Sequence, residues 1–202
     1  MIILEHEQQS PEWHAARCGC PSASNFDLIV TTKGETSKQR EKYLYRLAGE
    51  RITGKAEETY QNAAMQRGTE LEGEARSFYQ LVNDVEVKQV GFCLADGNFR
   101  YGCSPDGLIG ENGIIEIKCP LIATHVGYLL KGELPIDYFQ QVQGGLLVTG
   151  REWTDFISYY CGMDPLIVRV ERDDAFIDKL KGHLEDFCIE LDKIVKTLKK
   201  ER

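Results

Sequence analysis

The segment that most constrains the fold is Gly-Ile-Ile-Glu-Ile-Lys at residues 113–118. In an extended strand successive side chains point to opposite faces, so Ile115 and Ile117 share one face and Glu116 and Lys118 share the other. The isoleucine face is typical of a face packed on a core. A strand this apolar does not suit an open sheet edge, so we predict that it lies inside a sheet.

Short segments rich in β-branched and aromatic residues surround this strand and alternate with helical patterns. Further strands are predicted at 85–93, 98–104, 152–161 and 166–171. Helices are predicted at 11–18, 22–30, 37–52, 66–82, 120–130, 136–149 and 173–198, with Ser10 and Ser37 as N-caps. The pattern indicates an α/β fold with a central mixed β-sheet flanked by helices.

The length of 202 residues suits a single domain. Its expected parts are an N-terminal helical part at about 10–82, a sheet core at about 85–171 and a C-terminal helix at about 173–198. No run of about 18 apolar residues occurs, so no membrane span is predicted. The first residues turn acidic and lack the basic region of a secretory signal, so we expect a cytoplasmic protein.

The net charge of −8 argues against a protein that coats nucleic acid by general electrostatics. It leaves room for a DNA enzyme whose basic residues gather on one surface. Composition therefore lowers the expectation of nucleic-acid binding without deciding it.

Seven cysteines, an odd number, favour reduced thiols over a disulfide framework. Cys18 and Cys20 are close enough in sequence to share a metal, but no second close pair completes a zinc set. Iron–sulfur ligation by four scattered cysteines stays open as an alternative. We favour small buried apolar side chains.

A second acid, Asp106, precedes the charged strand across a Gly-rich turn. If the turn centres near Glu111, Asp106 falls opposite or beside Glu116, with Cβ atoms about 4.5–5.5 Å apart. Carboxylates at that distance repel each other, and a divalent cation such as Mg²⁺ removes the conflict. A solvated surface hairpin is the alternative, but Pro105 and the apolar strand favour a metal site. Such a metal would polarise a phosphate and activate a water, and Lys118 would orient that water or stabilise the developing charge.

Four motifs occur in a fixed order along the chain. They are Trp-His-x-x-Arg-x-Gly-x-x-x-Ala-Ser within 12–24, Gly-x-x-x-Glu-x-x-Ala-Arg within 68–76, Ser-Pro-Asp-Gly with Glu-Ile-Lys-Cys-Pro within 104–120, and Gln-Val-Gln within 138–146. This set resembles the YqaJ-like viral recombinases, the lambda-type phage exonuclease branch of the PD-(D/E)xK nuclease superfamily. The resemblance covers residues 12 to about 148 and implies a restriction-endonuclease-like core.

The resemblance also implies a role for each matching residue of the acidic cluster. Asp106, Glu116 and the backbone carbonyl of Ile117 would bind magnesium, and Lys118 would be the catalytic lysine. Glu72 would be a further acidic residue of the site, near a second metal position. The family's helix motif often begins with Trp-Gly, whereas this chain has Arg67 before the glycine, and we expect Arg67 to face DNA or solvent.

Three residues match the family's pocket for the DNA 5′-phosphate, namely Arg17, Ser24 and Ser104. An arginine can bind phosphate through two parallel hydrogen bonds. Ser24 lies where a predicted helix begins, and the free backbone N–H groups of that helix end would attract an anion. Gln141 and Gln143 match the amide-bearing helix that lines the active site in the family. An exposed polar stripe is the alternative for these two glutamines.

The resemblance implies a Mg²⁺-dependent 5′→3′ exonuclease, with Mn²⁺ as a substitute and two metals in the site. It would digest one strand of linear duplex DNA to mononucleotides and leave 3′ overhangs for a phage single-strand annealing protein. It implies a homotrimeric ring, encoded by a phage or prophage. An endonuclease or nicking enzyme of the same superfamily, and a non-catalytic DNA-end-binding protein, are the alternatives.

Overall fold

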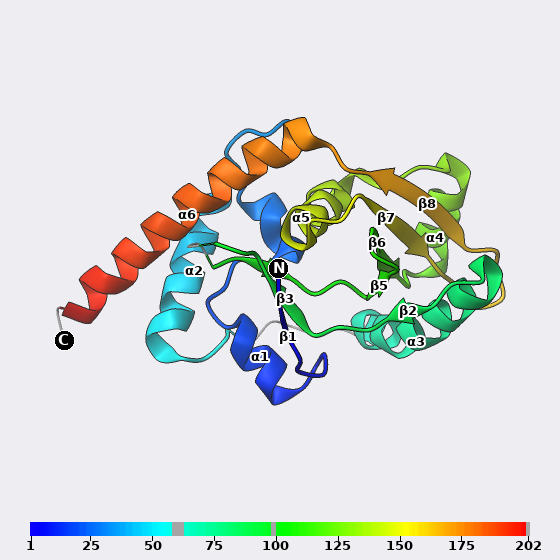
Figure 1. Cartoon of the computed structure of the whole chain (residues 1–202), viewed down its shortest axis with the longest axis horizontal. Coiled ribbons are helices and arrows are strands. Elements are labelled where there is room, and N and C mark those ends of the chain that lie inside the picture. Colours follow the sequence, from blue (N-terminus) through cyan, green and yellow to red (C-terminus); the bar gives the residue numbers. More distant parts are fainter. Residues whose placement is uncertain (58–62, 98–99, 201–202) are drawn as a thin grey trace.

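The computed structural model describes residues 1–57, 63–97 and 100–200. Its main sheet has five strands in the order β2-β5-β6-β7-β8 (Figure 1). These strands span Val87–Lys88, Gly107–Ile109, Gly113–Lys118, Trp153–Ser158 and Leu166–Glu171. Strands β6 and β7 run parallel, and the other neighbouring pairs of this sheet are antiparallel. The predicted α/β class with a central mixed sheet is confirmed, and the apolar strand β6 lies in the middle of the sheet.

A smaller sheet contains β1, β3 and β4, in that order, with antiparallel neighbours. These strands span Ile2–Leu4, Phe92–Leu94 and Gly102–Cys103. The single strand predicted at 85–93 is therefore wrong, because β2 joins the large sheet and β3 joins the small one. Between them Gly91 passes so close to β1 that a Cβ would lie 2.3 Å from the Leu4 carbonyl oxygen. Of the strand predicted at 98–104, residues 98–99 lie outside the described part of the chain.

Helices cover both faces of the large sheet (Figure 1). On one face, Ile115 and Ile117 of β6 pack with Ala75 and Tyr79 of α3 (Ala63–Asn83). On the other face, Ile114 belongs to the apolar cluster that includes side chains of α5 (Phe139–Thr149). The predicted alternation of β6 is thus confirmed, and the face that carries Glu116 and Lys118 is the α5 face.

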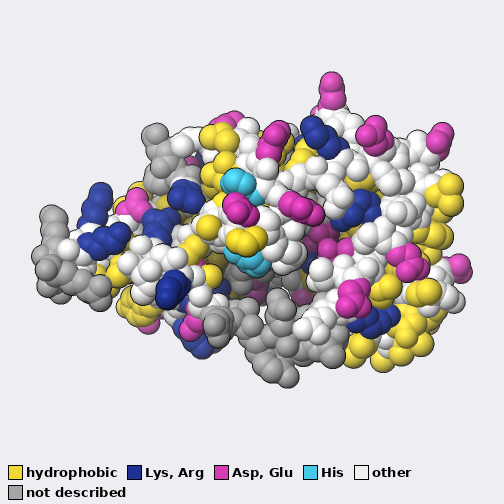
Figure 2. All heavy atoms as spheres, turned by 90° about the horizontal axis from the view of Figure 1, so that it is seen from below, with side chains coloured by type: hydrophobic (Ala, Val, Ile, Leu, Met, Phe, Trp, Pro, Cys, Tyr) yellow, Lys and Arg dark blue, Asp and Glu magenta, His cyan; other side chains and the backbone are white. Residues whose placement is uncertain are grey.

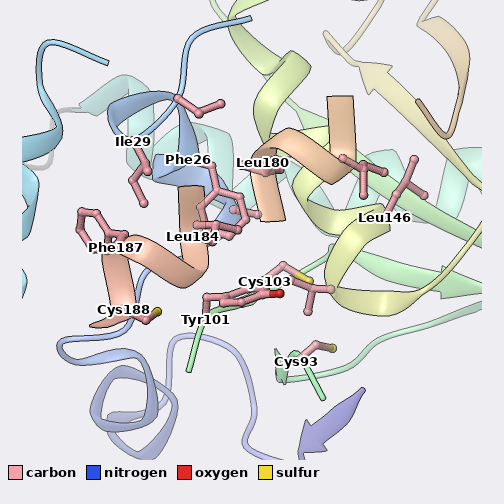
Figure 3. Packing of buried hydrophobic residues seen from close by; sticks show 14 of the residues in the cluster. Phe26, Ile29, Cys93, Tyr101, Cys103, Leu146, Leu180, Leu184, Phe187 and Cys188 are labelled. Atoms are coloured by element: carbon pink, nitrogen blue, oxygen red, sulfur yellow. The ribbon is translucent and has the colours of Figure 1, made fainter. Parts of the chain in front are cut away.

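The larger apolar cluster joins the N-terminal and C-terminal parts of the chain (Figure 3). Helix α6 (Asp174–Lys200) runs alongside α2 (Arg40–Thr53) and contributes Leu184 and Phe187 to this cluster. Phe26 from the 3₁₀ helix η1 (Ala23–Leu28) and Leu146 from α5 complete it. The long amphipathic C-terminal helix predicted from the sequence is therefore present, with its apolar side on the core. Helix α4 (Ile122–Lys131) and the short 3₁₀ helix η2 (Ile136–Tyr138) lead from β6 to α5.

The first helices differ in detail from their predicted bounds. Ser10 caps α1 (Pro11–Arg17) as predicted, because its Oγ accepts the Trp13 N–H at 3.2 Å. The helix predicted at 22–30 is instead the short 3₁₀ helix η1, interrupted at Asn25 by non-helical backbone angles. Helix α2 begins at Arg40 rather than at Ser37.

Gly144 allows α5 to lie directly against η1. A Cβ at this position would meet the Phe26 ring at 2.4 Å and the Ala23 Cβ at 3.3 Å. A side chain larger than hydrogen would therefore push the two helices apart. This close contact fixes the distance between the polar residues that η1 and α5 carry.

Charged side chains of both signs are interspersed on the face of the molecule seen in Figure 2. Within residues 1–57, 63–97 and 100–200, no helix is long and apolar enough to cross a membrane. All seven cysteines are free thiols, and five of them are buried.

Candidate active site

A cavity of about 360 Å³ opens beside the carboxyl end of β6. Its walls come from the segment before α1, from α1, η1, α3, the β4–β5 connection, β6, β7 and α5. The polar and charged residues that line it are Gln8, Gln9, Arg17, Ser24, Glu72, Ser104, Asp106, Glu116, Lys118, Gln141 and Thr154. Residues far apart in the sequence therefore share one small space.

Asp106 lies directly opposite Glu116 in the register of β5 and β6. Gly107 pairs with Ile115, and the backbone N–H of Asp106 donates to the Ile115 carbonyl at 3.2 Å. The Ile117 N–H donates to Asp106 Oδ2 at 2.6 Å, so the carboxylate replaces the backbone acceptor that β5 would have supplied. The turn before β6 thus places the two carboxylates as the sequence predicted.

Glu116 is the centre of a short polar chain. Its Oε1 lies 2.6 Å from Lys118 Nζ and accepts a hydrogen bond from Gln141 Nε2 at 2.5 Å. The Glu116 side chain is 10% exposed and that of Lys118 is 27% exposed. Because Glu116 is largely shielded from water, its contacts with the ammonium and amide groups are stronger than they would be at the surface.

The pKa values of Asp106 and Lys118 are both raised, for different reasons. Burial, then the charge of Glu116, raise the pKa of Asp106 well above its usual value, while Lys118 and the Ile117 N–H oppose the rise. For Lys118, burial alone would lower the pKa, but the Glu116 and Asp106 carboxylates raise it above its usual value. Lys118 is therefore protonated at neutral pH, and one ammonium group does not neutralise the acidic cluster.

Glu72 reaches the cavity from α3. It lies on the side of the helix that carries the buried Ala75, as its position in the apolar pattern predicts. Burial raises its pKa, and the charge of Glu116 adds to this, while Lys118 and Arg76 oppose it. Three carboxyl groups thus face one ammonium group in the same space.

The donor set suits a hard divalent cation. Asp106 and Glu116 offer carboxylate oxygens, which are the ligands that Mg²⁺ prefers. The Ile117 carbonyl points to the same side of β6 as its N–H, and that N–H is bound by Asp106. Among the described residues no three His, Cys, Asp or Glu side chains are already gathered at metal-ligand distance. Asp106, Glu116 and the Ile117 carbonyl therefore fit one cation, and Glu72 lines the same cavity.

Arg17 and Ser104 form the second part of the cavity. Arg17 Nη1 donates to Ser104 Oγ at 3.0 Å, and the Trp13 indole N–H donates to the same oxygen at 3.2 Å. The Arg17 guanidinium lies 4.0 Å from the centroid of the Trp13 ring. Burial lowers the pKa of Arg17, which still leaves it charged at neutral pH. The aromatic ring and the serine hold a half-buried positive group at the cavity.

Ser24 joins this group because η1 lies against the smaller sheet. Ser22 forms an isolated parallel bridge with Gly102, whose N–H donates to the Pro21 carbonyl at 3.0 Å. The Ser24 hydroxyl lies 3.1 Å from the Ser22 hydroxyl. Because η1 is a short, interrupted 3₁₀ helix rather than the predicted α-helix, the expected anion site at its N-terminus stays a prediction. Ser24 lines the cavity.

Comparison with known proteins assigns the chain to a family. The sequence pattern described as the YqaJ-like viral recombinase domain matches residues 12–152. The chain belongs to the YqaJ-like viral recombinase family. No curated protein sequence matches it.

Solved structures support the same assignment. An alkaline exonuclease from Laribacter hongkongensis is 37% identical, with a TM-score of 0.87 over 95% of this chain and 97% of that one. The same values hold for its complex with dAMP. A phage-related exonuclease from Haemophilus somnus shares the fold, with a TM-score of 0.68 at 16% identity over 89% of this chain and 96% of that one. The predicted enzyme class, an exonuclease, is confirmed by the first match.

One sequence prediction about this YqaJ domain is corrected by the structure. Gln143 is 1% exposed and does not line the cavity; its amide donates to the Glu171 carbonyl and accepts the Asp173 N–H. It therefore connects β8 to α6, because α5 turns successive side chains by about 100° and only Gln141 faces the site. Arg67 is half-buried, donates to the Pro120 carbonyl and lies 4.6 Å from the Tyr160 ring centroid, and its expected contact with DNA stays a prediction.

Sequence reasoning missed two side chains that hold the Asp106 loop of the YqaJ domain. Gln8 Nε2 donates to the carbonyls of Pro105 and Val90, both at 2.9 Å. Arg76 Nε donates to the Asp106 carbonyl at 3.0 Å. Arg76 belongs to the Ala-Arg end of the α3 motif, which is a usable signal, whereas Gln8 lies in a polar segment with no pattern.

Proposed function

We propose that this protein is a Mg²⁺-dependent 5′→3′ exonuclease that acts on the ends of linear double-stranded DNA. It releases mononucleotides and leaves 3′ single strands for annealing during phage recombination. The observation that carries the proposal is the shared cavity, which contains the Asp106–Glu116–Lys118 cluster and the Arg17–Ser104 pair. One half of the cavity suits phosphodiester cleavage, and the other half suits a terminal phosphate.

Asp106, Glu116 and the Ile117 carbonyl would hold the cation, and Glu72 would contribute to a second metal position through water. A bound divalent cation would polarise the scissile phosphate and lower the pKa of the attacking water. The raised pKa of Asp106 supports this assignment, because a buried carboxyl that repels its neighbour gains most from a cation. Mn²⁺ would substitute, since the ligands are all oxygens.

Lys118 and Gln141 both contact Glu116 and would support its role in the reaction. Lys118 carries a full positive charge and would stabilise the charge that develops on the phosphate, or orient the water. Gln141 donates to one oxygen of Glu116 and would leave the other oxygen to bind the cation. Both contacts exist before substrate binds, which reduces the reorganisation needed for reaction.

Arg17, Ser24 and Ser104 would bind the 5′-phosphate of the DNA end. An arginine held against Trp13 is preorganised for a bidentate contact with phosphate. Binding the 5′-phosphate beside the metal ligands places the first phosphodiester of that strand at the acids, which supports 5′→3′ polarity and mononucleotide release. The dAMP complex of the alkaline exonuclease relative is consistent with a site that accepts a mononucleotide.

A homotrimeric ring around the DNA is part of the proposal. It would reconcile a net charge of −8 with DNA binding, since only the residues facing the channel need be basic. A phage single-strand annealing protein would receive the 3′ strand. Sedimentation velocity with and without a short duplex tests the trimer; a monomer at all concentrations contradicts it.

Single substitutions test the catalytic assignment. Asp106→Ala, Glu116→Ala and Lys118→Ala should each abolish Mg²⁺-dependent digestion of linear duplex while circular dichroism shows a folded protein. Near wild-type digestion by all three variants would contradict the mechanism. Incubation with covalently closed circular duplex separates an exonuclease, which leaves the circle intact, from an endonuclease of the same superfamily.

A further inference from the structure

The ammonium group of Lys118 has an aromatic partner as well as an acidic one. Its Nζ lies 2.6 Å from Glu116 Oε1 and 5.2 Å from the centroid of the Tyr138 ring. A lysine ammonium within about 6 Å of a ring centroid is attracted by the negative face of the ring. We propose that Tyr138 is a positioning residue that holds Lys118 at the cleavage site. This inference rests on the proposed function, in which Lys118 acts on the scissile phosphate.

The Tyr138 ring is itself fixed by other aromatic rings. It lies 5.1 Å from the Phe156 ring and 6.5 Å from the Tyr128 ring, measured between centroids. Phe156 is fully buried on β7 and pairs with Glu116 on β6. The ring that faces Lys118 is therefore attached to the same part of the sheet that carries the acidic cluster.

Local sequence explains why Tyr138 and Gln141 act on the same ion pair. Tyr138 ends η2 and is the residue directly before α5. Gln141 follows three residues later, so the two side chains lie about one helical turn apart on the same side. Gln141 binds the Glu116 carboxylate and Tyr138 contacts the Lys118 ammonium. The start of α5 thus supports both members of the pair.

Tyr138 becomes most important when Glu116 binds a cation. The ammonium group of Lys118 is carried on a flexible four-carbon chain, so contacts with neighbouring groups are needed to hold it in one conformation. If Glu116 shared its charge with a metal, its attraction for the ammonium would weaken. The contact with Tyr138 does not involve a proposed metal ligand, so it would be retained. Tyr138 would therefore keep Lys118 in place in the reactive state.

Two substitutions separate the aromatic face from the bulk of the side chain. Tyr138→Phe keeps the ring, and Tyr138→Leu keeps an apolar side chain without a ring. We expect Tyr138→Leu to lower kcat about 2- to 30-fold with KM for DNA unchanged, the range given by a cation–π contact. Tyr138→Phe should restore kcat to within about twofold of the wild type. Phe139→Leu is the matched control, because Phe139 packs on Phe176, with ring centroids 4.7 Å apart, and does not line the cavity.

A measurement of lysine reactivity, made with and without Mg²⁺, tests the contact without relying on activity. Lysine acetylation by an N-hydroxysuccinimide ester is followed by peptide mass spectrometry, with the exposed Lys131 as internal reference. Loss of the ring removes one of the two groups that hold the Lys118 ammonium, so its acetylation rate relative to Lys131 should rise in Tyr138→Leu, and the rise should be several-fold when Mg²⁺ is present. The ratio should stay at the wild-type value in Tyr138→Phe and Phe139→Leu.

The outcomes distinguish this inference from the proposed function. Wild-type kcat and a wild-type acetylation ratio in Tyr138→Leu would overturn the positioning role while leaving the nuclease assignment intact. An equal loss of kcat in Tyr138→Phe and Tyr138→Leu would also overturn the positioning role, because the aromatic ring would then not be the group that supports kcat. If the wild-type protein shows no Mg²⁺-dependent cleavage, the proposed function fails, and the acetylation ratios still decide whether Tyr138 holds Lys118.

Discussion

Substitution of Arg17 tests the proposed 5′-phosphate site. Arg17→Ala removes a half-buried guanidinium whose carbon lies 4.0 Å from the centroid of the Trp13 ring and which donates to Ser104 at 3.0 Å. Because Nη1 is engaged by Ser104, the remaining N–H groups are the ones available to a phosphate. One hydrogen bond between charged groups contributes about 1.5–3 kcal/mol. At about 1.36 kcal/mol per tenfold, its loss corresponds to about 10- to 150-fold.

The assay compares two linear duplexes that differ only in a 5′-phosphate or a 5′-hydroxyl. The quantity of interest is the ratio of kcat/KM on the two ends, since losses of folded protein or of chemistry cancel in this ratio. We expect Arg17→Ala to lower the ratio of kcat/KM on 5′-phosphate ends to that on 5′-hydroxyl ends by about 10- to 150-fold. Arg17→Lys should recover part of it, because lysine keeps the charge without the planar fork.

Arg40→Ala serves as the matched control for Arg17→Ala. Arg40 also contacts an aromatic ring, that of Phe187 at 5.3 Å, and binds Glu190 at 2.7 Å, but it does not line the cavity. Its substitution should leave the end preference unchanged. An unaltered preference in Arg17→Ala, or an equal loss on both ends, would refute the phosphate assignment.

Three further predictions concern the neighbourhood of the acids. A carboxyl group whose pKa is higher in the folded than in the unfolded protein lowers stability as the pH rises from the unfolded-state pKa through the folded-state pKa. Metal-free Asp106→Asn should therefore melt at a higher temperature than the wild type in EDTA at pH 8. On adding Mg²⁺, only the wild type should gain Tm. Gln141→Ala should lower the single-turnover cleavage rate with little change in the Tm measured by calorimetry. Gln143→Ala should lower Tm with little change in the cleavage rate per folded molecule. The reverse pattern would contradict the placement of the two amides. Gly144→Ala should cost about 1–3 kcal/mol of unfolding free energy in urea, because its Cβ would meet a ring of η1 at 2.4 Å, whereas Gly127→Ala, with open space around it, should be neutral or stabilising.

Local patterns predicted which side chains of β6 lie on each face of the sheet. Period-two alternation placed Ile115 and Ile117 on a core face and Glu116 on the opposite face, and the Gly-rich turn placed Asp106 opposite or beside Glu116, as the structure has them. These features depend on residues close in sequence, where strand geometry leaves few choices. The α3 pattern likewise placed Glu72 beside the cavity.

Features that depend on contacts between residues far apart in the sequence could not be predicted from local patterns. The split of residues 85–93 between two sheets depends on the approach of Gly91 to β1, and the position of Ser24 depends on a bridge between Ser22 and Gly102. Gln143 was misplaced because two glutamines at i and i+2 cannot share a helix face, and the sequence does not say which one faces the site. Such choices are made by tertiary packing.

The central claim is that the Asp106–Glu116–Lys118 cluster cleaves DNA from 5′ ends with a divalent cation. The most direct measurement is a time course on linear duplex labelled at either the 5′ or the 3′ end, with Mg²⁺ or with EDTA. Release of the 5′ label as mononucleotide from the first time points, with the 3′ label still on long strands, is the predicted result. EDTA or Asp106→Ala should prevent it. Earlier release of the 3′ label, or equal release in EDTA, would contradict the account.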